Sequence, residues 1–426
     1  MELQLAKGVR DIPPEEKIVM NRILSTLQSV FQQYGFVPLE TPLLERIETL
    51  TAKGGAGEES DALKEIFRMK DQGDRDLGLR FDLTVPLARY VAMNSQLKLP
   101  FKRYEMGPVF RDGPIKLGRY RQFWQCDIDT IGVKGMLAEA EQLALVESAF
   151  QKLGVEIVIK VNNRKVLNGI LNQCEIKEKE SAITALDKLE KIGTKGVTEE
   201  LQQRGYSSED IISIFEIIKE KINLKELKKK VTNAEAQEGI KELEELFVYL
   251  KDMKVKCVEF DVSLARGLGY YTGTVFEVFA QNSKVTSSIA GGGRYDEMVG
   301  KFAGGGRDIP AVGIAFGLST ILDVLREKQE FKEKTAARAY IIPIQTVKES
   351  LKIIQKLRAK NIAVDMDLNG KGIGKNLEYA SAQGIPYVII IGSEELKQKK
   401  VMLRDMQSGK QELLSLAETV KILKKK

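Results

Sequence analysis

The stretch Phe101–Ile131 carries the side chains best suited to chemistry. If its second half is a strand, every second residue from Arg119 to Asp129 lies on one face. That face is cationic at one end, aromatic in the middle and acidic at the other: Arg119, Arg121, Phe123, Gln125, Asp127 and Asp129. Arginine forks suit phosphate oxygens, an aromatic or guanidinium face suits a nucleobase, and carboxylates suit a cationic amino acid. The order therefore predicts a site for a nucleotide beside a basic amino acid.

Two nearby segments add candidates to this face. Arg111 ends the preceding strand and supplies a further guanidinium. Alternation over Arg80–Thr84 puts Asp82 and Thr84 on one side, where they would receive an ammonium group. The alternative is an ordinary antiparallel ribbon with a solvated polar face. The order of the charges favours a binding site over that alternative.

The absence of histidine limits the chemistry that this chain can perform. None of the 426 residues is a histidine, which excludes Ser-His, Cys-His and His-metal schemes. The three cysteines are scattered and form no CxxC motif, so free thiols in a reducing cytoplasm are expected. The net charge of +6 permits a polyanionic partner such as RNA without requiring one. Arginine, lysine, carboxylates, amides and the substrate's own groups remain as the reactive groups.

Hydrophobic periodicity predicts the elements that must position these residues. Helices are expected at 15–34 and 137–153, and strands at 77–84, 101–111, 119–131, 257–265 and 274–281. The segment 168–254 is rich in Lys and Glu, free of proline and helical in period, which predicts an inserted helical module. No apolar run approaches the roughly 18–20 residues needed to span a bilayer. The first residues lack a signal-peptide pattern, so a cytoplasmic protein without membrane contact is expected.

A second domain is expected after the polar linker 327–337. Its predicted strands are 338–344, 362–367, 387–391 and 400–404, and its predicted helices are 347–360, 373–383 and 411–425. This alternation is typical of a small α/β domain with a largely parallel sheet. The glycine- and lysine-rich stretch 370–375 fits neither phosphate-loop pattern and is interpreted as a basic turn.

Several peptides together resemble the signatures of the histidyl-tRNA synthetases, a family of class II aminoacyl-tRNA synthetases. They are KGVRD at 7–11, GRYRQFWQ at 118–125, RGLGYYTG at 266–273 and AGGGRYD at 290–296, with Pro42 at the place of the dimer-forming first motif. The resemblance implies an α+β class II catalytic domain, an antiparallel sheet flanked by helices, over 1–167 and 255–326. It also implies a helical insertion at 168–254 and a C-terminal α/β anticodon-binding domain at 338–426.

The resemblance further implies an activity and residue roles. It implies ATP-dependent activation of histidine, transfer to tRNA(His), ATP and Mg²⁺ as cofactors, and a homodimer. Implied ATP-binding residues are Arg111, Asp112, Arg119, Arg121 and Phe123. Implied histidine-binding residues are Asp82, Thr84, Gln125, Asp129, Arg266, Tyr270, Tyr271 and Tyr295. Arg111 and Arg266 would be the catalytic cations, and Lys116 would contact the tRNA acceptor end. No protein-held metal is expected.

One departure from the family pattern concerns the nucleotide site. The third class II motif matches 313–320, but Ser319 and Thr320 stand where Glu-Arg is usual. Arg294 or Arg307 could compensate for the missing guanidinium. Two alternatives therefore stay open: a non-catalytic synthetase-like regulator and a sensor of uncharged tRNA.

Overall fold

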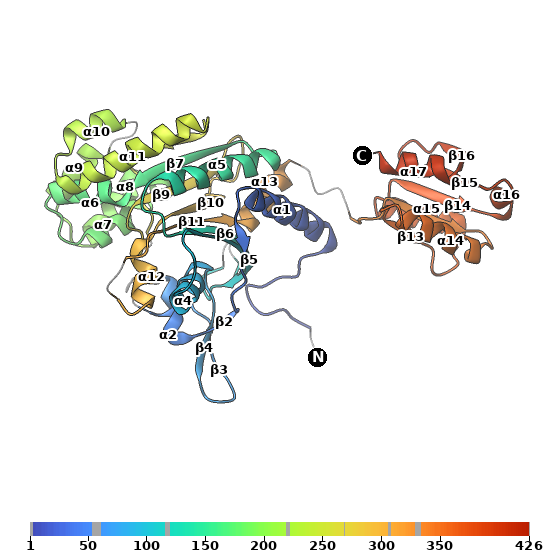
Figure 1. The fold of residues 1–426 in the computed structure, drawn as a ribbon, viewed down its shortest axis with the longest axis horizontal. Helices are drawn as coiled ribbons and strands as arrows, with labels where there is room; N and C mark the ends of the chain where they lie inside the picture. Colours follow the sequence, from blue (N-terminus) through green and yellow to red (C-terminus); the bar gives the residue numbers. More distant parts are fainter. Residues whose placement is uncertain are drawn as a thin grey trace. The chain divides into compact units, whose positions relative to one another are not determined.

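A computed structural model describes residues 3–52, 61–115, 120–218, 222–267, 269–305, 308–328 and 334–425 (Figure 1). The chain divides into two compact units, one of residues 1–10 and 23–327, the other of residues 11–22 and 328–426. Within the described ranges, none of the helices combines the length and the apolar character that crossing a membrane requires.

An eight-stranded sheet is the centre of the first unit. Its strand order is β1 (Val37–Pro38), β5 (Phe101–Phe110), β6 (Gln122–Ile131), β11 (Ala311–Gly317), β10 (Ala290–Arg294), β9 (Thr274–Ala280), β7 (Ile157–Asn163) and β8 (Val258–Phe260). Only the outermost pairs, β1 with β5 and β7 with β8, are parallel. The long antiparallel β5–β6 pair confirms the predicted ribbon, and the register pairs Asp129 with Gly313 of β11.

Helices cover this sheet and close its core. They are α1 (Pro14–Gln33), α5 (Leu137–Lys152) and α13 (Leu318–Glu327), together with α4 (Thr84–Met93) and α12 (Asp296–Phe302). The short helices α2 (Ile47–Leu50) and α3 (Asp61–Lys64) precede α4 in the sequence, and α2 packs against it. Phe31 and Phe150, from α1 and α5, both pack on Phe316 of β11, with ring centroids 5.4 and 5.7 Å away. α4 and α12 share a second cluster with the ends of β6 and β11.

The segment before α4 differs from its prediction. A strand was expected over 77–84, but β4 (Asp76–Leu79) ends earlier and pairs with β2 (Leu44–Arg46) and β3 (Arg68–Lys70) in a small sheet. Thr84 is instead the first residue of α4, and the Asp82 carboxylate accepts the Val85 N–H at 3.0 Å. The helix begins here because Asp82 satisfies an amide of its first turn, where Pro86 is also tolerated.

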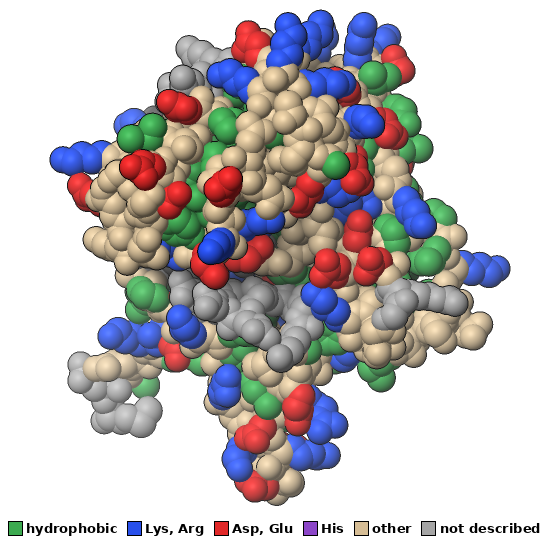
Figure 2. Space-filling model, turned by 90° about the vertical axis from the view of Figure 1, so that its left-hand side faces the viewer, with side chains coloured by type: hydrophobic (Ala, Val, Ile, Leu, Met, Phe, Trp, Pro, Cys, Tyr) green, Lys and Arg blue, Asp and Glu red, His purple; other side chains and the backbone are tan. Residues whose placement is uncertain are grey.

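Six helices between β7 and β8 form what we call the helical module. They are α6 (Arg164–Gln173), α7 (Lys179–Leu186), α8 (Leu189–Gln203), α9 (Ser208–Ile217), α10 (Leu224–Lys230) and α11 (Ala234–Asp252). Positive and negative side chains alternate over its surface in the upper part of Figure 2. Many pair with one another, as in Lys188–Glu200 and Lys228–Glu244. Its charges are therefore largely a solvated helix surface.

The second unit contains a five-stranded sheet. Its order is β13 (Val364–Met366), β12 (Ala339–Pro343), β14 (Tyr387–Ile391), β15 (Lys400–Asp405) and β16 (Gln411–Ser415), with helices α14 (Val347–Arg358), α15 (Ile373–Ala382), α16 (Ser393–Lys397) and α17 (Leu416–Lys424). The first three strands are parallel and the last two antiparallel, so the sheet is mixed. The predicted helix 411–425 was wrong in its first third, because β16 pairs with β15 and Ser415 caps α17.

Candidate active site

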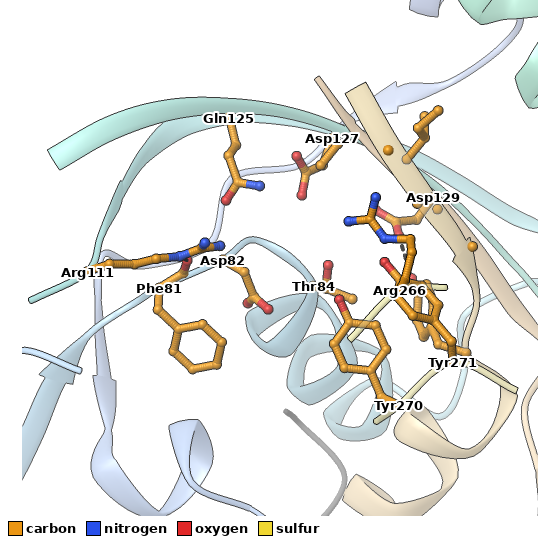
Figure 3. Close-up of a pocket in the computed structure, with 17 residues that line it drawn as sticks. Phe81, Asp82, Thr84, Arg111, Gln125, Asp127, Asp129, Arg266, Tyr270 and Tyr271 are labelled. Carbon is orange, nitrogen blue, oxygen red and sulfur yellow. Dashed lines mark hydrogen bonds between the residues drawn. The ribbon is translucent and has the colours of Figure 1, made fainter. Parts of the chain in front are cut away.

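A cavity of about 150 Å³ opens above the middle of the eight-stranded sheet. Nine of the predicted site residues line it: Asp82, Thr84, Arg111, Gln125, Asp129, Arg266, Tyr270, Tyr271 and Tyr295. In Figure 3, Arg111 and Arg266 enter from opposite sides, with Asp82 and Thr84 between them. Residues separated by more than 200 positions in the sequence, such as Asp82 and Tyr295, thus meet at one place, which we call the central pocket.

The sheet supplies the floor of the central pocket, and glycines make that floor accessible. Gln125, Asp127 and Asp129 project from β6, as the alternation predicted. On the neighbouring strand, a Cβ atom at Gly313 would lie 1.9 Å from Oδ1 of Asp129. The glycine at this position is therefore required by the close approach of the Asp129 carboxylate.

Asp129 is held by two buried partners. Nη2 of Arg103 lies 2.7 Å from its Oδ2, and the Tyr295 hydroxyl donates a hydrogen bond to its Oδ1. Burial raises the pKa of the Asp129 carboxyl, while the Arg103 charge and the Tyr295 hydrogen bond act in the opposite direction. Asp129 and Tyr295 together present a polar edge suited to a heteroaromatic ring.

Asp127 is a pocket residue that the sequence analysis placed on the charged strand face but to which it gave no role. Its side chain is 3% exposed and lines the cavity, and its Oδ1 has no hydrogen-bond partner among the described residues. Burial raises the pKa of Asp127 well above its ordinary value, opposed by the charge of Arg103. Its place between Gln125 and Asp129 on the same strand face was the signal that could have identified it.

Asp82 lies opposite Asp127, at the start of α4 (Figure 3). Burial raises the pKa of the Asp82 carboxyl to about 6, against the opposing effects of the Val85 amide and the Arg111 charge. An ammonium group placed beside it would restore the ionised form. Asp82 can therefore act as a receiver of a positive charge near neutral pH.

The Arg266 guanidinium is closely packed where it enters the pocket. Nη1 donates to Glu277 Oε1 at 3.0 Å, and the guanidinium carbon lies 5.6 Å from the centre of the Tyr271 ring. A Cβ atom at Gly291 would lie 2.1 Å from the same Nη1. Burial alone would lower the pKa of Arg266. The coulombic effects of Tyr271, Glu277 and Tyr270 outweigh burial and raise the pKa above its ordinary value, so the guanidinium stays charged at all relevant pH values.

A second cleft of about 210 Å³ shares Arg111 with the central pocket. Aromatic side chains dominate its lining: Tyr120, Phe123 and Trp124, with Pro114, Ser319 and Thr320. The Arg111 guanidinium lies 5.1 Å from the centre of the Phe123 ring. A flat aromatic ring could stack on the side chains of this cleft, and negatively charged groups attached to the ring could then contact Arg111.

The Thr320 end of this cleft is already hydrogen-bonded within the protein. Its Oγ1 donates to the Gly317 carbonyl at 2.8 Å. Arg294, one of the two suggested substitutes for a guanidinium here, instead forms a buried pair with Glu139 at 2.6 Å. Arg307, the other, lies outside the described residues. Arg294 is therefore a structural residue.

Four residues predicted for the nucleotide and tRNA sites do not line the central pocket or lie outside the described residues. Arg121 and Asp112 pair with each other, Nη1 to Oδ1, at 3.0 Å, and neither lines the central pocket. Lys116 and Arg119 belong to the segment 116–119, outside the described residues.

The described residues contain no group of three or more Cys, Asp or Glu side chains placed to hold a metal ion. Asp82, Asp127 and Asp129 line the central pocket, and Asp129 is paired with Arg103.

Comparisons with known proteins agree on one family. The sequence profile described as histidyl-tRNA synthetase matches residues 8–321, and that of an anticodon binding domain matches 338–426. Histidine–tRNA ligase 1 of Bacillus cereus is 43% identical over 415 residues, 96% of each chain. The histidine–tRNA ligase of Clostridium tetani is 40% identical over 98% of this chain and 97% of its own.

Solved structures give the same result for the fold. The crystal structure of histidyl-tRNA synthetase from Nostoc sp. superposes with a TM-score of 0.86 at 33% identity, covering 100% of this chain and 99% of that one. An ATP phosphoribosyltransferase regulatory subunit/histidyl-tRNA synthetase from Bacillus halodurans gives 0.74 at 22% identity, covering 90% and 97%. At that identity the second likeness shows the fold alone.

Proposed function

The chain belongs to the histidyl-tRNA synthetase family, and from this premise we propose how its residues perform the reaction of an ATP-dependent histidine–tRNA ligase. In the first step, histidine and ATP form histidyl-adenylate and diphosphate. In the second, the histidyl group passes to the 3′ end of tRNA(His). The observation that carries the proposal is that Arg111 and Arg266 enter one pocket whose other polar side chains are three carboxylates, three tyrosines, Thr84 and Gln125.

Two arginines would neutralise the charge that develops at the α-phosphate in the first step. The histidine carboxylate attacks the α-phosphorus, and the reaction needs in-line positioning and neutralisation of growing negative charge. Arg111 lines both cavities and would contact the α-phosphate and the carboxylate together. Arg266 approaches from the other side (Figure 3). A guanidinium stays charged and presents fixed donors, so no protein base is required.

The aromatic cleft is the proposed adenine site. Phe123 would stack on the base, and Arg119 would contact the distal phosphates. Arg121 and Asp112, which pair with each other, would support this site from the loop side. Mg²⁺ would enter with ATP, held mainly by the triphosphate oxygens, as is usual for this ion in nucleotide sites.

The carboxylates and tyrosines form the proposed histidine site. Asp82 and Thr84 would receive the α-ammonium group, assisted by Gln125. Asp129 and Tyr295 would contact the imidazole nitrogens, with Tyr270 and Tyr271 closing the pocket around the ring. Asp127, whose buried Oδ1 faces the cavity, would add a further polar contact to the substrate.

The second step is also possible without a histidine side chain. The terminal ribose hydroxyl of the tRNA would attack the adenylate carbonyl, and a phosphate oxygen of the adenylate would accept the proton. The acyl–phosphate bond would break, and AMP would leave. The substrate thus supplies the base that the protein lacks.

Different parts of the chain are proposed to contact different parts of the tRNA. The catalytic domain would comprise 1–167 and 255–326, the insertion 168–254 would approach the acceptor arm, and 338–426 would bind the anticodon. Lys116 would read the acceptor end.

A homodimer is proposed through the first motif. The edge strand β1 and its surroundings expose Val37, Leu43 and Leu44, at 48, 41 and 46%. Sedimentation equilibrium tests this part, since a monomer at micromolar concentration would contradict it.

One substitution favours a second candidate, a synthetase-like protein without catalysis. Ser319 and Thr320 stand where the family usually has Glu-Arg, so one adenine contact is missing. An intact pair of arginines in the central pocket supports catalysis over this alternative.

The decisive experiment compares wild type and Arg266→Ala in ATP–pyrophosphate exchange. We expect kcat to fall by about 10²–10³-fold, as for loss of a donor that stabilises transition-state charge, with a much smaller change in the histidine KM. Equal losses in kcat and in histidine affinity would make Arg266 a binding residue only.

A further inference from the structure

The junction of β7 and α6 holds the peptide that carries Arg266. The Asn162 side chain donates to the carbonyls of Val262 and Leu264, at 3.0 and 2.9 Å. Two residues later, the Arg164 N–H donates to the Gly273 carbonyl at 2.8 Å. The peptide that includes Arg266 is thus fixed before and after the arginine.

Arg164 also contacts the main chain of Arg266 directly. Its Nη1 donates to the Arg266 carbonyl at 3.3 Å. Its side chain is 4% exposed, and a buried guanidinium requires a counter-charge. Glu180 supplies it from the first turn of α7, with Oε2 at 2.5 Å from Nη2. The orientation of Arg164 therefore depends on a helix of the helical module.

The other end of α7 contacts the same peptide. Asp187 is the C-cap residue of α7, and a Cβ atom at Gly267 would lie 3.2 Å from its Oδ2. The main chain at Gly267 thus rests against the end of this helix. Both ends of α7 thereby limit the position of the Arg266–Gly267 peptide, one through Arg164 and one by direct contact.

The Arg266 side chain has little room to compensate for a shift of its main chain. On the pocket side, Nη1 is bound to Glu277 and lies against Gly291. A displacement of the carbonyl would therefore move the guanidinium relative to the reacting phosphate, and small displacements of a positioned group are costly in rate.

We infer that Arg164 is a positioning residue for Arg266, and that Glu180 of the helical module holds Arg164 in the orientation that adenylation requires. The inference rests on the proposed role of Arg266. It makes the helical module part of the activation step, in addition to any contact with RNA.

Exchange kinetics of the full-length protein test the inference. Arg164→Ala is expected to lower kcat about tenfold, since a misplacement of roughly 1 Å can cost 10²-fold, with the histidine KM nearly unchanged. Arg164→Lys and Glu180→Gln should give smaller losses in kcat. Glu238→Gln is the matched control, because Glu238 pairs with Lys165 of the same helix, at 2.7 Å, away from Arg266. It should exchange at the wild-type rate.

A double-mutant cycle separates positioning from general damage. In an Arg266→Ala background, Arg164→Ala and Glu180→Gln should have no further effect, because the group they position is gone. The same fold-loss in both backgrounds would overturn the inference. If Arg164→Ala does not fold, Glu180→Gln gives the same decision. A wild-type rate for Arg266→Ala alone would instead refute the proposed role of Arg266, whereas no exchange by the wild type would refute the proposed function.

Discussion

Nη2 of Arg103 lies 2.7 Å from Oδ2 of Asp129, and both side chains are almost completely buried beneath the central pocket. Arg103 also lies 3.6 Å from Glu105, whose other oxygen accepts from Arg80. The carboxylate proposed to contact imidazole is therefore one end of a buried ionic chain. Removing one partner from such a chain leaves an uncompensated charge.

Two neighbouring aspartates should consequently respond differently to the same substitution. Asp129→Asn leaves Arg103 without its nearest carboxylate and should lower the free energy of unfolding by about 3–5 kcal/mol. Asp127→Asn should change it little, because burial already disfavours the charged form of Asp127, raising its pKa, and its Oδ1 has no hydrogen-bond partner among the described residues. Urea unfolding at pH 7 measures both. Equal destabilisation of the two variants would contradict the ionic pairing of Asp129 with Arg103. Both substitutions should raise the histidine KM.

Substitution of Asp82 by Asn should weaken histidine binding and raise the free energy of unfolding. Its folded-state pKa of about 6 lies above the ordinary 3.8, so it contributes stability below pH 4 that is lost as the pH rises through 6. Asp82→Asn should therefore raise the free energy of unfolding at pH 7 by roughly 1–3 kcal/mol. The same variant should weaken histidine binding, since it removes the receiver of the ammonium group.

The pH dependence provides the check on Asp82. The wild-type histidine KM should rise as the pH falls below 6, where the carboxyl becomes protonated. Free histidine titrates in the same range, at about 6.5, so the ratio of the Asp82→Asn KM to the wild-type KM is the quantity to plot. A ratio that stays constant from pH 5 to 8 would show that Asp82 does not receive the charge.

Substitution of Phe123 should weaken the binding of ATP and leave the binding of histidine almost unchanged. Stacking of a base on an aromatic side chain contributes roughly 1–3 kcal/mol, so Phe123→Ala should raise the ATP KM by about 5–150-fold. The histidine KM should stay within twofold, because Phe123 lines the aromatic cleft and not the central pocket. Initial rates at varied ATP and histidine measure both. A larger effect on histidine would place adenine elsewhere.

Local periodicity explains which parts of the site could be predicted. Gln125 and Asp129 were selected because a strand has a fixed period of two, which β6 obeys, and both side chains line the central pocket. Asp82 and Thr84 were selected on the same argument although Thr84 begins a helix. Both side chains still line the pocket, Asp82 from the segment before α4 and Thr84 from its first residue.

Long-range pairing explains what could not be predicted. Arg294 was a candidate for the nucleotide site, but its partner Glu139 lies 155 residues earlier, and no local pattern shows that contact. The Arg121–Asp112 pair depends on how two strand ends face each other, which alternation does not specify. The link from Arg164 to Arg266 spans 102 residues and was equally invisible.

The most direct measurement is pyrophosphate exchange by the purified protein with ATP, Mg²⁺ and single amino acids. The account predicts exchange with histidine and none with lysine or arginine, whose cationic side chains lack a ring to fit between Asp129, Tyr295 and the paired tyrosines. No exchange with histidine at any concentration would contradict it, and would leave a synthetase fold that binds without catalysing.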